Sequence, residues 1–297
     1  GVDLDDRAIQ LAQLGLYIKA KRRRRSAKVD HFNVVSSDFF LPDFDEVKHL
    51  FDNGEKLQPE LANIVADIWR DLQQAHRFGS LLRIEEKFNE KLRALTGNKG
   101  LENNLFEKDM IADYEQFRQT FFDNLQKAVA HNAERQGVTF LNTKTQDAIA
   151  YLDVMTQKYD VAVANPPYTD SSDFGPELKK FVDANYRQPY KFNANLYASF
   201  ICRCAEFTDG AGKMALIHPL TFMYIKTFED VRKLIIEKLH VNVFVDYGPD
   251  ATNLFDGSFA SAAAFYVLEK DGITDTAWFV SLDQYTRTPQ EKFKKDY

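Results

Sequence analysis

Apolar and polar positions follow two different periods along this chain, and the strand signals are clearest in its second half. Four apolar runs there have the length and composition of buried strands. They are Tyr159–Ala164, Lys213–His218, Val241–Asp246 and Ala262–Leu268. Amphipathic stretches with helical spacing lie between them, at Pro176–Asn185, Leu196–Glu206 and Thr227–Leu239. This alternation predicts an α/β domain with a largely parallel sheet covered on both faces.

The first half begins with a strand signal and continues mostly as helix. Gly1–Leu4 is typical of the end of a strand, and Asp5 and Asp6 occupy the cap and first turn of a helix. Apolar and small residues then recur at helical spacing and predict a buried stripe. They are Ala8, Leu11, Ala12, Gly15 and Ile18. His31–Ser36 predicts a second short strand.

A charged helical block separates these strands from the later ones. Its apolar residues keep a 3.6-residue period at Leu57, Leu61, Ile64, Ile68 and Leu72. A second long helix is predicted from about Glu102 to Arg135. We therefore predict an α/β core formed by residues 1–43 and 143–297, interrupted by a helical insertion at 44–142.

The composition is that of a globular protein, with 44% hydrophobic and 28% charged residues. No apolar run reaches the roughly 20 residues of a membrane span. Cys202 and Cys204 lack partners at the spacing of a metal site, so neither a structural zinc nor a disulfide framework is expected, and a cytoplasmic location fits. The formal net charge of −6 excludes general attraction to polyanions, so any contact with nucleic acid requires a local basic patch.

One such patch follows the first predicted helix. Seven of the ten positions from Lys19 to Lys28 are basic, including Arg22, Arg23, Arg24 and Arg25. Contact with DNA phosphates is one interpretation. A solvated helix end, stabilised by the helix dipole, is the other, and the sequence leaves both open.

The residues with the clearest chemistry are Asn165, Pro166, Pro167 and Tyr168, directly after a predicted strand. Ligands of α/β sheets bind beyond the carboxyl ends of the strands. Two prolines stiffen the turn and remove two backbone donors. The Asn165 side-chain oxygen and the Pro166 carbonyl can together accept both hydrogens of an amino group, leaving its lone pair free to attack an electrophile. Tyr168 offers a flat face for stacking on a planar group.

Asp160–Tyr168 (DVAVANPPY) resembles the catalytic motif of S-adenosylmethionine-dependent adenine-N6 DNA methyltransferases. Several other stretches resemble, in the same order, the large adenine-specific methyltransferases of BREX-type phage-defence and restriction-modification systems. These are Arg7–Ala12, Phe78–Ile84, Leu178–Phe181, Asn195–Ile201 and Gly212–Phe222.

The resemblance implies a Rossmann-like methyltransferase sheet and a set of cofactor-binding residues. It assigns Asp3 to the S-adenosylmethionine ribose hydroxyls, with Leu4 beside the adenine, and places Asp38 and Phe39 around that adenine. Helix capping for Asp3 and a turn role for Asp38 are the alternatives. Phe255 is similar to the family's second base-stacking aromatic residue, although an ordinary core position explains it equally well. His218, at a later strand end, is at most a residue lining the site.

The family's sheet has the strand order 3-2-1-4-5-7-6 with the last strand antiparallel, and its first strand ends in a glycine-rich cofactor loop. No such element precedes Asp3, and the turn Gly210–Gly212 lies before the wrong strand. We therefore expect a sheet without its first strand, and an isolated chain that is inactive and binds S-adenosylmethionine weakly or not at all. A target-recognition region is also expected to be absent.

The implied reaction is methyl transfer to the N6 amino group of an adenine flipped out of double-stranded DNA. Other defence or restriction-modification subunits are the expected partners, with no membrane and no metal. Two alternative functions remain for the protein. Protein-glutamine methyltransferases use a similar motif, but they are compact and lack a large insertion. A non-catalytic DNA-binding or assembly subunit would lack the upstream glycine-rich loop in the complete protein.

Overall fold

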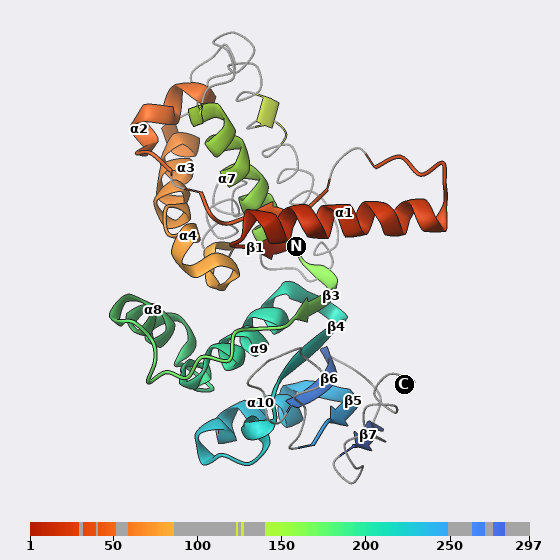
Figure 1. Ribbon diagram of the computed structural model, residues 1–297. Helices are drawn as coiled ribbons and strands as arrows, with labels where there is room; N and C mark the ends of the chain where they lie inside the picture. Colours follow the sequence, from red (N-terminus) through yellow and green to blue (C-terminus); the bar gives the residue numbers. More distant parts are fainter. Residues whose placement is uncertain are drawn as a thin grey trace, which may run out of the picture. The chain divides into compact units, whose positions relative to one another are not determined.

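The computed structural model describes residues 1–29, 32–39, 41–51, 59–85, 123, 126–127, 140–248, 263–270 and 276–282. The chain divides into two compact units, Gly1–Gln157 and Lys158–Tyr297 (Figure 1). Much of the predicted insertion at 44–142, including the long helix expected at Glu102–Arg135, lies outside the described residues. The insertion and its boundaries therefore stay predictions.

The first unit contains a two-stranded parallel sheet and a group of helices. Strand β1 (Val2–Asp3) pairs with β2 (Val35–Ser36), and Asp3 lies opposite Ser36. The helices are α1 (Asp6–Arg23), α2 (Phe44–Val47), α3 (Pro59–Leu72), α4 (Ala75–Phe78) and α7 (Phe140–Thr156), with 3₁₀ turns η1 (Lys48–Phe51) and η2 (Gly79–Leu81). Ile68 and Leu72 of α3 are buried, as the predicted helical period requires, whereas Leu57 and the side chains of Leu61 and Ile64 lie outside the described part of the chain.

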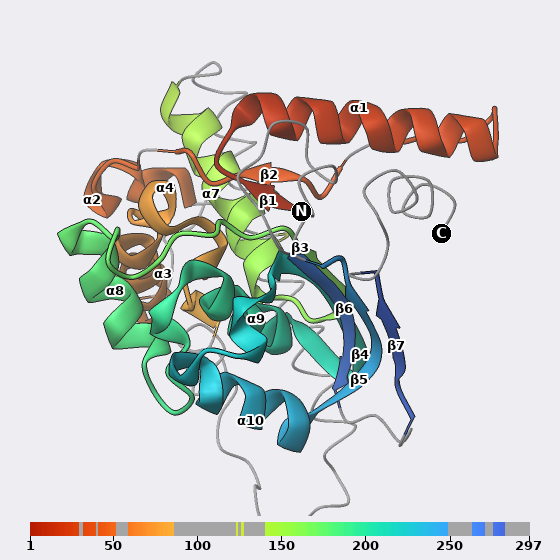
Figure 2. The same ribbon diagram turned by 60° about the horizontal axis from the view of Figure 1, so that its bottom comes forward.

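Helix α1 begins where the sequence predicts, because Asp5 is its N-cap. The Asp5 carboxylate accepts the Arg7 backbone N–H at 2.9 Å, and this hydrogen bond lowers the pKa of Asp5. The predicted buried stripe is wrong: Leu11 is 69% exposed and Ile18 42% exposed, whereas Ile9 is buried. Figures 1 and 2 both show why, since only the first turns of α1 lie against β1 and β2.

Gly79, between α4 and η2, has a backbone conformation that side chains rarely adopt, with φ +49° and ψ −137°. A Cβ at this position would lie 3.4 Å from Ser37 Oγ and 3.8 Å from Leu4 Cγ. The Gly79 carbonyl accepts the buried Tyr151 hydroxyl at 2.8 Å. This turn is therefore held close to the ends of β1 and β2.

Replacing Gly79 with alanine is expected to lower the free energy of unfolding by about 1–3 kcal/mol, because the side chain strains the backbone at this φ. Gly15→Ala is the matched control. Gly15 lies within α1, and a Cβ added there would meet no atom within 4 Å, so alanine should stabilise the fold by about 0.5–1 kcal/mol. Urea unfolding of both variants measures the difference. Equal effects of the two substitutions would contradict the strain at Gly79.

The second unit contains a five-stranded mixed sheet with the order β3-β4-β6-β5-β7. Its strands are β3 (Tyr159–Ala164), β4 (Thr208–Pro219), β5 (Leu239–Asp246), β6 (Ala263–Lys270) and β7 (Trp278–Ser281). Its helices are α8 (Pro176–Tyr186), α9 (Leu196–Phe207) and α10 (Glu229–Lys238), with 3₁₀ turns η3 (Phe192–Ala194), η4 (Leu220–Met223) and η5 (Lys226–Phe228). β3 and β4 are parallel, β6 is antiparallel to both β4 and β5, and β7 is parallel to β5.

This topology confirms the mixed sheet and the antiparallel strand β6, and the order β3-β4-β6-β5 is the one expected for the last four strands. In the described part of this unit α9 and α10 lie on one face of the sheet, and coverage of the other face stays a prediction. Met214, Leu216 and His218 of β4 are buried on the face that carries α9 and α10 (Figure 2). On the opposite face Val161 is 60% and Val163 73% exposed. Strand β7 was not predicted.

The glycines at 210–212 form an irregular part of β4 rather than a turn before it. The pairing of β3 with β4 shifts register there, from Tyr159–Thr208 to Val161–Lys213. A Cβ on Gly212 would lie 2.6 Å from the Asp209 carbonyl oxygen, so only glycine fits this bulge. The strand therefore continues through a sequence whose glycines indicated a turn.

Candidate functional site

The Asn165–Tyr168 loop leaves the sheet directly after β3, as the sequence predicts. Asn165 and Pro167 are exposed, whereas Pro166 is buried and anchors the turn. The Tyr168 hydroxyl donates to Asn165 Oδ1 at 2.9 Å and lies 3.2 Å from the carbonyl oxygen of Ile217 in β4. Partial burial raises the pKa of the Tyr168 phenol, so the hydroxyl keeps its proton at neutral pH. The exposed amide is thus hydrogen-bonded to a hydroxyl that also lies beside the end of a second strand.

The chain after Tyr168 is fastened to the start of α9. The Thr169 carbonyl accepts the Leu196 backbone N–H at 3.0 Å, and Asp170 forms an isolated β-bridge with Asn195. Asn195 is also the N-cap of α9, since its side chain accepts the Tyr197 N–H at 3.2 Å. Neither Asn195 nor Ile217 was predicted to support the loop, although an asparagine directly before a helical stretch is a recognisable N-cap signal.

His218 is a buried residue near the end of β4. It is 0% exposed, its ring stacks on Tyr197 with a centroid separation of 4.3 Å, and Nε2 is hydrogen-bonded to the Tyr266 hydroxyl. Nδ1 is 2.9 Å from the Pro219 carbonyl oxygen, which can only accept, so Nδ1 carries the proton. Burial lowers the pKa of His218 to about 4. A neutral, enclosed imidazole cannot act as a base toward an external substrate.

In the first unit, the structure brings two predicted cofactor ligands to one sheet edge. Asp3 ends β1, and Asp38 lies two residues beyond the end of β2. The Asp3 carbonyl accepts the Ser37 N–H at 2.9 Å, and the Asp38 N–H donates to Ser36 Oγ at 3.1 Å. Asp3 Oδ1 also accepts the Asp5 N–H at 2.9 Å. Both carboxylates are exposed at the carboxyl ends of paired parallel strands, where α/β sheets bind ligands.

The two apolar residues predicted beside these acids differ in exposure. Leu4 is 47% exposed, so it can contact a ligand at this edge. Phe39 is 1% exposed, and its ring meets the edge of the Tyr151 ring at a centroid distance of 5.4 Å. Phe39 therefore supports the strand end from within the core, and its role as a cofactor wall stays a prediction.

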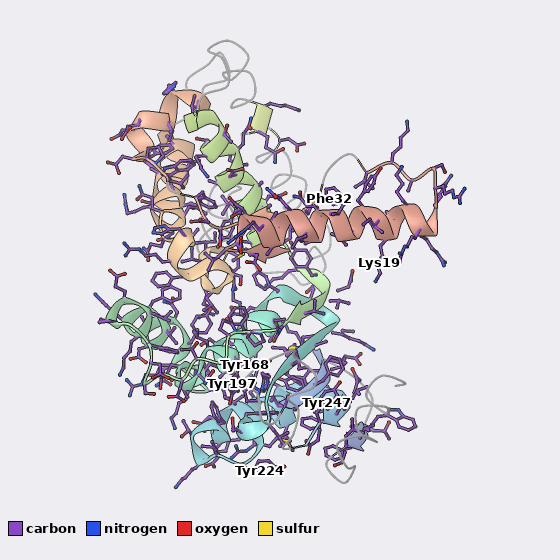
Figure 3. The ribbon with its side chains drawn as sticks, in the orientation of Figure 1. Lys19, Phe32, Tyr168, Tyr197, Tyr224 and Tyr247 are labelled. Carbon is purple, nitrogen blue, oxygen red and sulfur yellow. The ribbon has the colours of Figure 1, made fainter. Side chains whose placement is uncertain are left out.

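The arginine cluster lies at the end of α1. Arg22 and Arg23 are in its last turn, Arg24 is the C-cap, and all four side chains from Arg22 to Arg25 are exposed. Arg24 Nε donates to Ser26 Oγ at 3.1 Å. The position favours positive charge because the helix dipole is negative at this end. Both interpretations of the cluster therefore agree with its geometry. Figure 3 shows side chains radiating from this end of the helix, where Lys19 is labelled.

The predicted site residues are divided between the two units. Asp3, Asp38 and the arginine cluster belong to the first unit, and the Asn165–Tyr168 loop belongs to the second. Phe255 lies outside the described residues.

Among the described residues, no group of three or more His, Cys, Asp and Glu side chains is arranged to hold a metal ion. In the same part of the chain, every helix is too short or too polar to cross a membrane.

Comparison with known protein families identifies the family to which the chain belongs. The family described as Eco57I restriction-modification methylase matches residues 1–255. The chain belongs to this family. Both the strand edge with Asp3 and Asp38 and the Asn165–Tyr168 loop lie within the range that matches the Eco57I methylase family.

Curated relatives of this Eco57I-family chain are adenine-specific methyltransferases. PglX of Lacticaseibacillus casei (strain Zhang) is 24% identical over 273 residues, which cover 90% of this chain and 20% of PglX. BrxX of Escherichia coli O9:H4 (strain HS) is 20% identical over 290 residues, covering 90% of this chain and 21% of BrxX. The chain thus spans about a fifth of the length of these relatives. Among solved structures, the DrdV–DNA complex matches 54% of this chain and 18% of its own, with 17% identity and a TM-score of 0.39.

Proposed function

We propose that the complete protein is a site-specific DNA methyltransferase that methylates the N6 amino group of adenine, within a restriction-modification or phage-defence system. The observation that carries this proposal is the exposed Asn165 amide, held at the carboxyl end of β3 by the Tyr168 hydroxyl, in a chain of the Eco57I methylase family. The adenine-specific relatives PglX and BrxX support the choice of base.

The chemistry assigned to the loop needs no general base at the moment of attack. Asn165 Oδ1 and the Pro166 carbonyl accept the two amine hydrogens of an adenine flipped out of the duplex. This grip localises the nitrogen lone pair and points it away from the loop. Once the nitrogen carries the methyl group, it releases one of its two original protons to water, which restores a neutral amine. Pro166 and Pro167 carry no N–H that would compete for those oxygens. The ring of the half-buried Tyr168 supplies the stacking face.

The residues at the edge of the first unit fit a nucleoside. A carboxylate has about four acceptor positions, so Asp3 can hold ribose hydroxyls in addition to the Asp5 N–H. Asp38 can accept a hydrogen bond from an exocyclic amine, and the exposed Leu4 can lie against a purine ring. We propose that these three residues hold the nucleoside part of S-adenosylmethionine. When bound, S-adenosylmethionine supplies an electrophilic methyl group.

We also propose that a further strand pairs with the β3 edge. Among the described residues β3 pairs with β4 alone, and its valines at 161 and 163 are exposed on the face without helices. An unpaired edge with exposed apolar side chains favours coverage by another element. The family resemblance assigns this place to the first strand, which carries the glycine-rich cofactor loop.

The test of the proposed function is methyl transfer by the complete protein. Methyl-labelled S-adenosylmethionine is offered with duplex DNA, with duplex DNA lacking adenine, and with a release-factor-like protein. Label recovered as N6-methyladenine from the first substrate alone supports the proposal. Label on a glutamine side chain would assign the motif to protein methylation instead. Binding of DNA without any transfer would indicate an assembly subunit.

The arginine cluster gives a separate prediction for DNA binding. Changing Arg22–Arg25 to glutamine is expected to weaken DNA binding about tenfold near 0.1 M salt. The slope of log affinity against log salt should also become shallower, by about 0.9 for each phosphate that the variant no longer neutralises. Fluorescence anisotropy over a salt series measures both. The exposed Lys179 and Lys180 of α8, changed to glutamine, are a control for the loss of surface charge. If the slope of log affinity against log salt is the same for the arginine variant and wild type, the cluster does not contact DNA phosphates and is a solvated helix end.

A further inference from the structure

The Tyr168 hydroxyl contacts the group that the proposed function assigns to the substrate amine. It donates to Asn165 Oδ1 at 2.9 Å, while its oxygen lies 3.2 Å from the Ile217 carbonyl. Stacking on a base needs only the ring, so the hydroxyl is a separate chemical feature of this side chain. A tyrosine hydroxyl is protonated at neutral pH and able to donate, and burial shifts the pKa of Tyr168 further upward.

An exposed asparagine has a particular difficulty as an acceptor for an amine. Its side chain ends in an oxygen that accepts and an NH₂ that donates, and rotation about χ2 exchanges their positions. With the NH₂ toward the substrate, donor faces donor and the amine is repelled. Asn165 is exposed, so packing alone does not select one orientation. A donor fixed on the protein side selects the orientation in which Oδ1 lies beside it.

We propose that the Tyr168 hydroxyl is a positioning group that orients the Asn165 amide, so that Oδ1 is held in place to accept the substrate amine. The inference rests on the proposed function and assigns a role beyond stacking to Tyr168. Oδ1 has two lone pairs: one accepts the Tyr168 hydroxyl and the second remains for the amine. The hydroxyl has one proton, which it gives to Oδ1 at 2.9 Å, the nearer of its two acceptors; the Ile217 carbonyl oxygen of β4 lies farther away, at 3.2 Å.

The test is a set of variants in the complete protein, measured by single-turnover methyl transfer to adenine in DNA. Tyr168→Phe keeps the ring and removes the hydroxyl, and it is expected to lower the transfer rate about tenfold. DNA affinity should stay within about twofold of wild type. The fluorescence of 2-aminopurine at the target position, which reports a base outside the stack, should also be unchanged. Tyr224→Phe, at a tyrosine that is 69% exposed, is the matched control and should transfer at the wild-type rate.

Testing Tyr168→Phe in a second variant, Asn165→Asp, distinguishes orientation of the Asn165 amide by the hydroxyl from general structural support of the loop. A carboxylate presents an oxygen in either orientation, so Asn165→Asp removes the need for an orienting donor. Adding Tyr168→Phe to Asn165→Asp is therefore expected to lower the rate less than about threefold, compared with about tenfold beside Asn165. Equal penalties in the two backgrounds would overturn the orienting role and leave only support of the loop.

The outcomes also separate this proposal from the proposed function. If wild type methylates adenine and Asn165→Ala does not, but Tyr168→Phe transfers at the wild-type rate, the orienting role is wrong and the proposed function stands. If wild type transfers no methyl group to adenine, both are wrong. Loss of 2-aminopurine fluorescence in Tyr168→Phe would likewise overturn the orienting role, because the hydroxyl would then act on base stacking.

Discussion

Replacing Asn165 with alanine in the complete protein is expected to reduce methyl transfer to adenine by about a thousandfold. Removing one preorganised hydrogen-bonding group from a reacting centre costs about 10²–10³ in rate, and Asn165 Oδ1 is one of only two acceptors assigned to the amine. The side chain is exposed and contributes little to packing, so the fold should be retained. Single-turnover assays measure the rate, and circular dichroism measures the fold.

A control variant and a measurement of DNA affinity accompany this experiment. Asn33→Ala removes another exposed asparagine, in the first unit, and should leave the rate unchanged. DNA affinity of Asn165→Ala should remain near wild type, because one neutral hydrogen bond is a small part of binding dominated by phosphate contacts. N6-methyladenine formed by Asn165→Ala at even a third of the wild-type rate would remove Asn165 from the mechanism.

The second large effect is a loss of stability in acid that originates at His218. Burial lowers the pKa of His218 to about 4 in the folded chain, whereas histidine in an unfolded chain titrates near 6.5. Below pH 6.5 the unfolded state therefore binds a proton that the folded state does not. The stabilisation from the neutral imidazole is fully present above pH 6.5 and is lost as the pH falls toward 4. The expected loss is about 3 kcal/mol, at about 1.4 kcal/mol per pH unit.

Urea unfolding between pH 7 and pH 4 tests this expectation against the variant His218→Gln. Glutamine does not titrate, so the variant should lose less stability over this range, whatever its stability at pH 7. Subtracting the two curves removes the contribution of carboxylates, which titrate in both proteins. In the described part of the chain, the titratable groups in contact with His218 are the hydroxyl of Tyr266 from β6 and the phenol ring of Tyr197 from α9. The Phe222 ring and the Pro219 carbonyl, which do not titrate, also contact it. Burial raises the pKa of both Tyr197 and Tyr266 above the usual value for a tyrosine, so neither titrates in this range. Parallel curves for wild type and variant would contradict the buried neutral state.

The local features of this chain were predictable because they depend on neighbouring residues. The bounds of β3, the Asp5 cap of α1 and the position of the Asn165–Tyr168 loop all follow from short periods, capping chemistry and prolines. The expected pairing of β4, β5 and β6 is also confirmed. The turn predicted at the glycines of β4 was wrong, because a bulge and a turn need the same backbone freedom.

By itself, the sequence determined that Asn165–Tyr168 follows a strand, and that these residues hold an amine stays a prediction from their chemistry. Only the tertiary structure decided what surrounds them, because those contacts join residues distant along the chain. The Tyr168 hydroxyl meets the carbonyl of Ile217, 49 residues later, and His218 meets Tyr266 across the β4–β6 pair. Periodicity records the local spacing of apolar residues but not which side chain lies opposite. That is why His218 proved to be an interior residue and the apolar stripe of α1 proved to be exposed.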